Sequence, residues 1–224
     1  MSDVRWLAVR QEDLPHGEEW LAEAERAVLS GLRVPKRRAD WLLGRFAAKR
    51  ALVAAGEAVL ESEVAILPAA SGAPEAFLRG TRLPVTLSIT HAHGRAAAAV
   101  AAAETRLGLD LERVEPRPSG FLRDWFTPAE RRIVESAPAA EADLLTTLLW
   151  SAKESVLKAL REGLRVATTA VDVSPSPGPA DGTWRAFAAR GPGEAAWRGW
   201  WQAQGGFVLS AVAEPSSGPP ERIG

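Results

Sequence analysis

The spacing of apolar residues along the chain predicts a fold that mixes helices and strands. Apolar positions recur at helical spacing over 18–32, 38–55 and 142–162, and the last of these helices is expected to end at Gly163. The sequence FTPAE at 126–130 adds a helix start, because its threonine, proline and glutamate form a capping box. Short apolar stretches between turn residues predict strands at 63–68, 83–94, 107–114, 166–174, 183–190, 195–203 and 206–214.

The segment RAAAAVAAAE at 95–104 is compatible with either element. Alanine is the best helix former, so intrinsic propensity alone favours a helix. A turn lies on each side, however, and the strand at 107–114 follows after only a few residues, which makes a hairpin the simpler arrangement. We therefore expect a strand.

The two halves of the chain repeat one order of elements. Each half has a long helix, a glycine, a strand, a turn-rich loop and a hairpin, and short sequences recur between them: Arg50–Leu52 with Lys158–Leu160, and Ala99–Ala101 with Ala211–Ala213. Chance is the alternative explanation, because alanine-rich sequences match each other easily. The shared order favours an α+β fold of two related halves with a ligand cleft between them. Its parts would be an N-terminal half over 1–106, a C-terminal half over 107–214 and a flexible tail over 215–224.

Composition restricts the classes of function. The chain has 224 residues, of which 46% are hydrophobic, and a formal net charge of −1, which argues against bulk attraction to nucleic acid or to an anionic membrane. The absence of cysteine excludes disulfides, thiolate metal sites and cysteine nucleophiles. The phosphate loops GxxxxGK[ST] and GxGxxG are absent, so a phosphate-bearing ligand would be held by side chains and metal. Without a secretory signal or a long apolar run, a cytoplasmic location is the default expectation.

Two acidic residues occupy alternate positions in LGLDLERV, the expected strand at 107–114. In a strand, Asp110 and Glu112 project from one side, and Leu109 and Leu111 face the core on the other. Two carboxylates on one ladder repel each other unless a cation or a basic side chain lies between them. The pattern therefore predicts a positively charged partner for this strand.

The long helix of the second half carries further charged residues. Glu154 and Lys158 lie one turn apart, which is also the spacing of an ordinary solvated surface ion pair. Lys153 falls inside the apolar arc, so either its stem extends out to solvent or its ammonium group has a partner in the cleft. Magnesium prefers oxygen ligands, and the available carboxylates are those of Asp110, Glu112 and Glu154. Lys158 beside them would neutralise phosphate charge.

Basic residues of the first half are candidates for binding that phosphate. Arg45 and Lys49 lie one turn apart on the expected helix, downstream of the run Lys36–Arg38. Such a run is as often a solvated face, and this alternative stays open. The sequence HAH at 91–93 has the spacing of zinc ligands, but the chain has only one other histidine and no cysteine, so zinc is not expected.

Two longer motifs resemble those of the Sfp-type 4′-phosphopantetheinyl transferase family. The family has a G-x-D-x-E strand and, further along, a W-S-x-K-E-x-x-x-K helix, which read here GLDLE at 108–112 and WSAKESVLK at 150–158. Weaker family features occur in the same order: KRRADWLLGR, a turn at 72–74, SITH at 88–91 and FTPAE at 126–130. The resemblance covers residues 30 to 165 by motif.

The resemblance implies a fold and a set of site residues. The family fold is a pseudo-twofold pair of α+β halves, each a small sheet packed on a long helix, with coenzyme A between the halves. The matched magnesium ligands are Asp110, Glu112 and Glu154, and Lys158 matches a lysine near the pyrophosphate of coenzyme A. The matched coenzyme-binding residues are His91, with Thr90 beside it, at the phosphates, and Arg37 and Arg45, expected at the 3′-phosphate. One departure is Ala73, where many members have a lysine.

The implied reaction transfers the 4′-phosphopantetheine arm of coenzyme A to a serine of an apo carrier protein, releasing adenosine 3′,5′-bisphosphate, with magnesium as cofactor. Glu154 is the expected base for the serine proton, with Glu112 or a metal-bound water as alternatives. Carrier proteins are typically acidic, so the arginines and aromatic residues of 113–126 are expected to form the docking surface. The alternative for this segment is a loop that covers the second core.

Two other functions stay open beside this enzyme, which is expected to be a monomer. One is a non-catalytic module that binds coenzyme A or a carrier protein. The other is an unrelated magnesium-dependent phosphotransferase. The intact set of three carboxylates and one lysine in the two motifs argues against the non-catalytic module.

Overall fold

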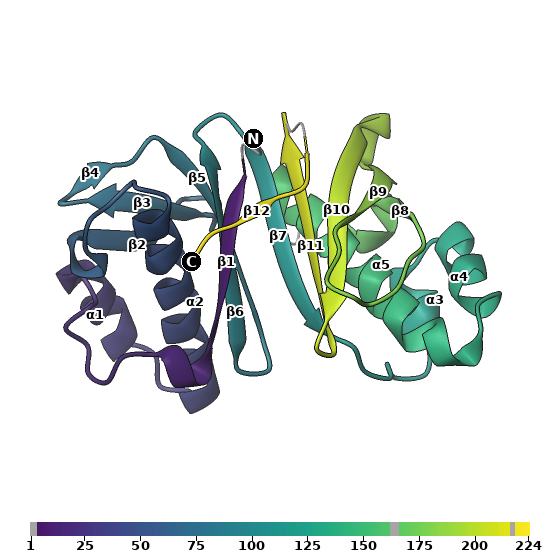
Figure 1. Ribbon diagram of the computed structural model, residues 1–224, viewed down its shortest axis with the longest axis horizontal. Coiled ribbons are helices and arrows are strands. Elements are labelled where there is room, and N and C mark those ends of the chain that lie inside the picture. Colours follow the sequence, from purple (N-terminus) through teal and green to yellow (C-terminus); the bar gives the residue numbers. More distant parts are fainter. Residues whose placement is uncertain (1–3, 162–165, 216–217) are drawn as a thin grey trace. The chain divides into compact units, whose positions relative to one another are not determined.

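The computed structural model describes residues 4–161, 166–215 and 218–224 and divides into two compact units. The N-terminal unit comprises Met1–Thr105 with Pro220–Gly224, and the C-terminal unit comprises Arg106–Pro219. Each unit combines helices with sheet, in agreement with the expected α+β class (Figure 1). Within the described ranges, no helix combines the length and hydrophobicity that crossing a bilayer requires.

The N-terminal unit consists of two sheets and two helices. Its main sheet has the strand order β12-β1-β6-β5, a second sheet has the order β2-β3-β4, and the long helix α2 packs on β1, β5 and β6 (Figure 1). The elements are β1 (Arg5–Arg10), α1 (Glu23–Ser30), α2 (Pro35–Ala54), β2 (Val64–Pro68), β3 (Pro74–Leu78), β4 (Thr81–Arg82), β5 (Val85–Ala92), β6 (Arg95–Ala102) and β12 (Glu221–Arg222), with short 3-10 turns at Gln11–Asp13 and Glu61–Glu63.

The alanine-rich segment is a strand, as its context predicts. β6 pairs along its whole length with β5 on one edge, and its residues 95–100 pair with β1 on the other. Its small side chains Ala96, Ala98 and Val100 join the core into which α2 inserts Phe46 and Leu52. Pairing on both edges and close packing against a helix therefore override the helix propensity of alanine. The hairpin partner of this strand is β5, which precedes it.

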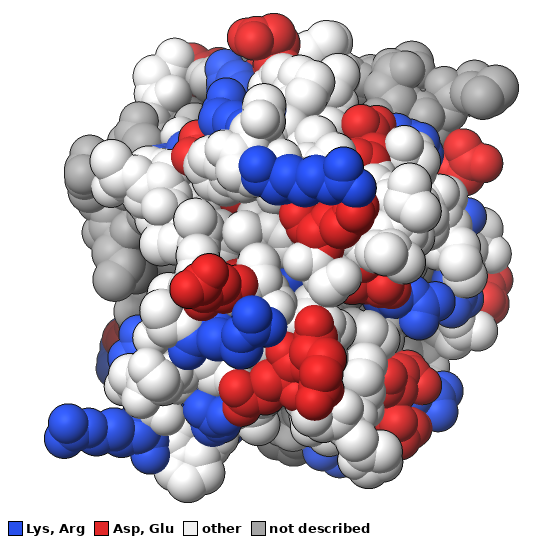
Figure 2. Space-filling model, turned by 90° about the vertical axis from the view of Figure 1, so that its left-hand side faces the viewer, with Lys and Arg blue, Asp and Glu red and all other residues white. Residues whose placement is uncertain are grey.

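The surface of the N-terminal unit carries both signs of charge. Figure 2 shows the side of the molecule on which α1 and the β2–β4 sheet lie, and basic and acidic side chains alternate over it. Many of these charges form pairs, such as Arg82 with Glu75 at 2.9 Å. Exposed pairs of this kind contribute little to stability, about 0–1 kcal/mol each.

The C-terminal unit is one five-stranded sheet with helices packed against it. The strand order is β7-β11-β10-β9-β8, and α5 packs on several of these strands (Figure 1). The elements are β7 (Arg106–Arg113), α3 (Phe121–Trp125), α4 (Pro128–Glu135), α5 (Ala139–Leu160), β8 (Asp172–Pro175), β9 (Arg185–Arg190), β10 (Ala196–Gln204) and β11 (Phe207–Glu214), with 3-10 turns at Thr168–Ala170 and Pro192–Glu194.

Four expectations about the elements differ from the structure or lie outside it. The helix expected over 18–32 spans only Glu23–Ser30. Residues 215–224 were expected to form a flexible tail, but Glu221 and Arg222 pair with β1 and Ile223 packs against the N-terminal core. The expected strand at 166–174 begins as a 3-10 turn and becomes a strand only at Asp172. The expected helix end at Gly163 lies outside the described residues.

A fully buried ion pair joins helices and sheet in the N-terminal unit. Glu25, in the first turn of α1, accepts hydrogen bonds from the backbone N–H groups of Ala22 and Ile66, each at 3.0 Å. The same carboxylate pairs with Lys49 of α2, and both side chains are 0% exposed. Lys49 also donates to the carbonyl of Trp20 at 3.0 Å. The pair thus ties α1, α2 and β2 together.

A second buried pair has the same construction in the C-terminal unit. Glu130, in the first turn of α4, accepts hydrogen bonds from the N–H groups of Thr127 and Val173 at 2.8 Å each, and it pairs with Lys153 of α5 at 2.7 Å. Both side chains are 0% exposed, and Lys153 also donates to the carbonyl of Thr168. The ammonium group of Lys153 therefore has an internal partner, and its stem does not extend to solvent. Burial lowers the pKa of Lys153 and raises the pKa of Glu130, while the pairing opposes both shifts.

Candidate functional site

The expected carboxylate strand lies directly against the long helix of its unit. A Cβ atom added to Gly108 would lie 1.7 Å from the Ser155 carbonyl oxygen, so only glycine allows β7 and α5 to approach so closely. Strand alternation places Asp110 and Glu112 on this same side. Leu109 and Leu111 lie on the other side of β7, where both are buried, as the alternation predicts. They are absent from the core cluster under α5, so the carboxylates and not the leucines face this helix.

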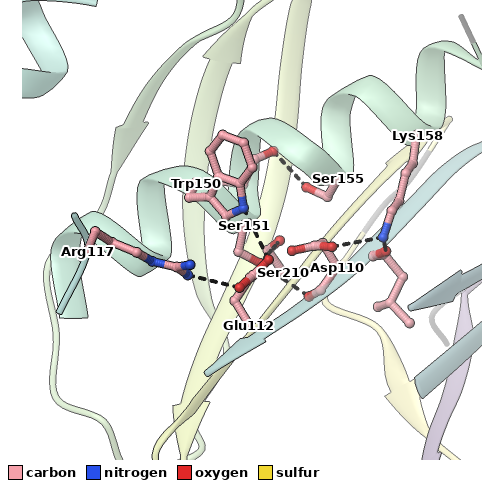
Figure 3. A network of polar contacts seen from close by, with 10 residues as sticks. Asp110, Glu112, Arg117, Trp150, Ser151, Ser155, Lys158 and Ser210 are labelled. Atoms are coloured by element: carbon pink, nitrogen blue, oxygen red, sulfur yellow. Dashed lines mark hydrogen bonds and ion pairs between the residues drawn. The ribbon is translucent and has the colours of Figure 1, made fainter. Parts of the chain in front are cut away.

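Asp110 has a basic partner on the helix. Its Oδ1 lies 2.8 Å from Nζ of Lys158, which also donates to the Leu109 carbonyl at 3.0 Å (Figure 3). The Asp110 side chain is only 7% exposed and that of Lys158 is 31% exposed. The ammonium group of Lys158 thus lies between the strand and solvent, where it compensates the negative charge of the nearly buried Asp110 carboxylate.

Glu112 has two partners, one for each carboxylate oxygen. Trp150 Nε1 donates to Oε1 at 3.1 Å, and Arg117 Nη2 lies 2.9 Å from Oε2 (Figure 3). Trp150 is the first residue of the WSAKESVLK motif, while Arg117 comes from the segment between β7 and α3. The positive partners that the strand pattern predicts are therefore Lys158 for Asp110 and Arg117 for Glu112.

Glu154 is electrostatically coupled to both carboxylates. Burial is the largest cause that raises its pKa, and the charges of Asp110 and Glu112 raise it further, whereas Lys158 lowers it. A raised pKa is typical of a carboxylate that exchanges protons in a catalytic centre, although buried structural groups show it as well. The structure thus brings together all four residues of the expected catalytic centre within the C-terminal unit.

Two serines under the strand were not predicted as site residues. Ser151 Oγ donates to the Asp110 carbonyl at 3.2 Å and lies 2.8 Å from Ser210 Oγ, with both serines fully buried (Figure 3). They fix the backbone of Asp110 against α5 and β11. The serine of the WSAKESVLK motif was the available signal for Ser151, but its partner on β11 is set by strand pairing that only the fold supplies.

The expected phosphate-binding residues of the N-terminal unit line a shallow groove. This groove has a volume of about 330 Å³ and gathers Arg37, Arg45 and His91 with Lys36 and Trp41. Helix α2 supplies all of these except His91, which comes from β5. Asp40 also lines the groove and pairs with Lys36 at 2.6 Å. The two arginines and the histidine beside an aromatic ring form a surface suited to an anionic ligand with a planar group.

One expected coenzyme contact of the N-terminal unit, and the position that departs from the family pattern, lie outside this groove. Thr90 is 4% exposed and precedes His91 on β5, so its side chain points to the opposite face of the strand. Ala73 is in the turn before β3, where its carbonyl accepts a hydrogen bond from the Ala69 N–H. Gly44 also lines the groove, and a Cβ there would meet Ile89 at 3.2 Å.

The segment expected to dock a carrier protein forms an aromatic cluster beside Glu112. Phe121 packs on Trp150 with the rings tilted by 60° and their centroids 5.2 Å apart, and Trp125 meets Trp150 edge-on at 5.6 Å. Phe126 is buried in the core of the unit, whereas Trp125 is 43% exposed. The segment therefore covers the core of the C-terminal unit, which was the alternative to a docking surface. It also presents an aromatic side chain to solvent.

Comparison with known proteins finds a family that the C-terminal unit resembles. Residues 106–212 match the family model of the 4′-phosphopantetheinyl transferase superfamily. Over these residues the C-terminal unit is similar to this superfamily. The 4′-phosphopantetheinyl transferase Svp of Streptomyces mobaraensis is 35% identical over 150 residues, which span 66% of this chain and 57% of that protein's length. Both matches confirm the resemblance that the GLDLE and WSAKESVLK motifs indicate.

Two solved structures of named transferases also align with part of the chain. One is a holo-(acyl-carrier-protein) synthase of Bacillus anthracis in complex with coenzyme A (3′,5′-ADP), with a TM-score of 0.38, 27% identity, and coverage of 44% of this chain and 93% of that one. The other is the Thermotoga maritima holo-[acyl-carrier-protein] synthase, with a TM-score of 0.37, 18% identity, and coverage of 48% and 61%. TM-scores this low carry no conclusion about the present fold.

Magnesium, which this family implies, is compatible with the types of donor present. Asp110, Glu112 and Glu154 offer only oxygen atoms, and their mutual repulsion would be relieved by a cation. The side chains are not gathered into a coordination shell, however. Over the described part of the chain, no group of three or more histidine, aspartate and glutamate side chains is arranged to hold a metal ion. The pairing of Glu112 with Arg117 and Trp150 is one physical reason for this.

Proposed function

We propose that the protein transfers the 4′-phosphopantetheine arm of coenzyme A to a serine of an apo carrier protein. The observation that carries this proposal is the assembly of three carboxylates and one lysine on β7 and α5: Asp110, Glu112, Glu154 and Lys158. The unit that contains them matches the family model of the 4′-phosphopantetheinyl transferase superfamily. The related Svp protein carries the name of this activity. The match spans 57% of that relative, so the activity of the whole chain stays a proposal.

The proposed reaction is a displacement at phosphorus. The carrier serine Oγ forms a bond to the phosphorus on the pantetheine side of the pyrophosphate, and the bond from that phosphorus to the bridging oxygen breaks. Adenosine 3′,5′-bisphosphate leaves with the bridging oxygen and its electron pair. Lys158 would stabilise negative charge on the phosphates, and Glu154 would accept the serine proton, with Glu112 as the alternative base.

Asp110, Glu112 and Glu154 would hold the magnesium ion. Bound there, magnesium would supply charge neutralisation for the pyrophosphate. Lys158 already compensates Asp110, so it would be shared between that carboxylate and the substrate. The buried Ser151 and Ser210 would keep the Asp110 backbone in place while these charges are exchanged.

The groove of the N-terminal unit is our proposed contact for the coenzyme. Arg37, Arg45 and His91 would bind phosphate groups of coenzyme A there. Thr90 would act only through the position of its neighbour, because its own side chain is buried on the other face. The exposed Trp125 and the arginines around it are the proposed docking surface for an acidic carrier protein.

The proposal includes the finer description of the fold as two duplicated, pseudo-twofold related halves over 1–106 and 107–214. The two matched buried ion pairs, Glu25–Lys49 and Glu130–Lys153, support it, since each joins the first turn of a short helix to a long helix and a strand. This correspondence aligns Lys49 with Lys153 rather than Arg50 with Lys158. We also propose that the protein is a cytoplasmic monomer, which sedimentation analysis can test for its oligomeric state.

Mass spectrometry of carrier proteins tests the function directly. Incubation of the protein with coenzyme A, magnesium and a panel of apo carrier proteins should add about 340 Da, the mass of the transferred arm, to at least one carrier. Binding of coenzyme A without a mass gain on any carrier would favour the non-catalytic module. Phosphate transfer to another acceptor would favour the unrelated phosphotransferase.

A further inference from the structure

Arg117 is a charged partner of Glu112 that neither family motif contains. It comes from the segment between β7 and α3, and its guanidinium group pairs with Glu112 Oε2 at 2.9 Å (Figure 3). The same guanidinium lies over the Phe121 ring, 5.4 Å from its centroid. Phe121 packs on Trp150, and Trp150 donates to the other oxygen of Glu112. These four contacts close a ring that fixes the Glu112 carboxylate.

The Arg117 pairing is incomplete on the arginine side. The side chain is 17% exposed, and its Nε atom is buried without a hydrogen-bond partner in the part of the chain that the structure describes. Only one guanidinium nitrogen, Nη2, contacts the carboxylate. A paired arginine would normally use its planar fork for two parallel bonds, which are stronger. The contact therefore neutralises Glu112 but is weaker than the best geometry would allow.

We propose that Arg117 is the resident counter-ion of Glu112 and that a divalent cation displaces it when it binds. The inference rests on the proposed function, in which Glu112 is a metal ligand. Arg117 and the cation compete for the same oxygen, Oε2, whereas the hydrogen bond from Trp150 occupies Oε1 and persists. Arg117 thus acts as a positioning residue that holds the carboxylate in place before the metal arrives.

The displacement has two consequences. A guanidinium group in competition for Glu112 weakens the binding of a cation, so loss of the arginine should tighten it. The pair also ties the segment before α3 to β7, so metal binding should loosen this segment. Metal occupancy would then be coupled to the mobility of the helix that carries the exposed Trp125.

Calorimetric titration of the full chain with Mg²⁺ or Mn²⁺, without coenzyme A, tests the competition. We expect Arg117→Gln to bind the metal about three- to fivefold more tightly than the wild type, the size of a partly exposed ion pair. Arg123→Gln is the matched control, since it removes the same charge from the same segment, where Arg123 is 73% exposed and pairs with Asp124. An equal effect of both variants would show a simple change of net charge and would overturn the inference.

Hydrogen exchange of the wild type provides a readout that needs no variant. Addition of Mg²⁺ should accelerate exchange of backbone amides in 115–125, and Arg117→Gln should show fast exchange without metal and little further change. Protection of this segment by metal would contradict displacement.

The variant Glu112→Gln separates the metal assignment from the role of Arg117. If Glu112→Gln binds the metal as tightly as the wild type, the metal assignment is refuted. If Glu112→Gln binds the metal more weakly but Arg117→Gln binds it as tightly as the wild type, only the role of Arg117 is refuted.

Discussion

The two units build similar frameworks but put different residues beside the long helix. In the N-terminal unit, Leu7 of β1 pairs with Ala98 of β6, and both belong to the apolar core under α2. In the C-terminal unit, Asp110 of β7 pairs with Ser210 of β11 under α5. The Ala-Val-Ala sequences of β6 and β11 align these positions.

The two units differ in the same way at the next position on the face of the strand that packs against the long helix. Val9 of β1 pairs with Ala96, while Glu112 of β7 pairs with Val208. One framework therefore carries leucine and valine where the other carries two carboxylates. Both units contain a buried Glu–Lys pair, so this pair is part of the shared framework. Lys158 and Arg117 pair with the carboxylates of the C-terminal unit, so they are part of the site.

The largest expected effect tests the shared framework. Lys49→Met and Lys153→Met each leave a buried glutamate without its partner, so each should lower the free energy of unfolding by about 3–5 kcal/mol. Urea denaturation of the two variants measures this. A large loss for one variant and none for the other would break the comparison, since the two pairs would then not be equivalent.

A smaller effect is expected where β7 touches α5. Gly108→Ala forces a methyl group against the Ser155 carbonyl, which should cost about 1–3 kcal/mol of stability. Gly44→Ala in α2 is the control, because its Cβ meets only a side-chain methyl at 3.2 Å and alanine favours the helix. Thermal unfolding that is unaffected by Gly108→Ala would contradict the close approach of strand and helix.

The smallest expected effect concerns the serine pair. Ser151→Ala or Ser210→Ala alone removes one hydrogen-bond partner from a buried hydroxyl and should cost about 1 kcal/mol. In the double variant both hydroxyl groups are absent, so the free energy of unfolding should be close to that of the wild type. The N-terminal core likewise has an alanine, Ala98, at the position that corresponds to Ser210. A double-mutant cycle from denaturant unfolding measures the coupling, and strictly additive losses would argue against a shared hydrogen bond.

Local patterns in the sequence predicted many of the helices and strands and the motif residues. The capping box of Thr127 and Glu130 was predicted and is confirmed, and the turns around β6 outweighed the helix propensity of its alanines. Strand β1 was not predicted, because RWLAVR has no clear alternation or flanking turn signal.

Contacts between distant residues account for what was missed. The sequence around Glu130 does not indicate that its partner is Lys153. The sequence around Glu112 likewise does not indicate that Arg117 and Trp150 bind its two carboxylate oxygens. Likewise, the period of the strand placed Asp110 and Glu112 on one side, but only the fold shows that this side packs against α5. Ion pairs and helix packing of this kind depend on tertiary structure, which periodicity does not specify.

The central claim is that the chemistry of the protein depends on the carboxylates of the C-terminal unit and not on their apolar counterparts. The most direct measurement is the rate of mass gain of a carrier protein with Asp110→Asn and with Leu7→Met. We predict a loss of about 10²- to 10³-fold for Asp110→Asn, since one charge-stabilising group is removed, with the fold retained by circular dichroism. Leu7→Met should leave the rate within about twofold, because the volume of the core is conserved. Transfer by Asp110→Asn at the wild-type rate would contradict the account.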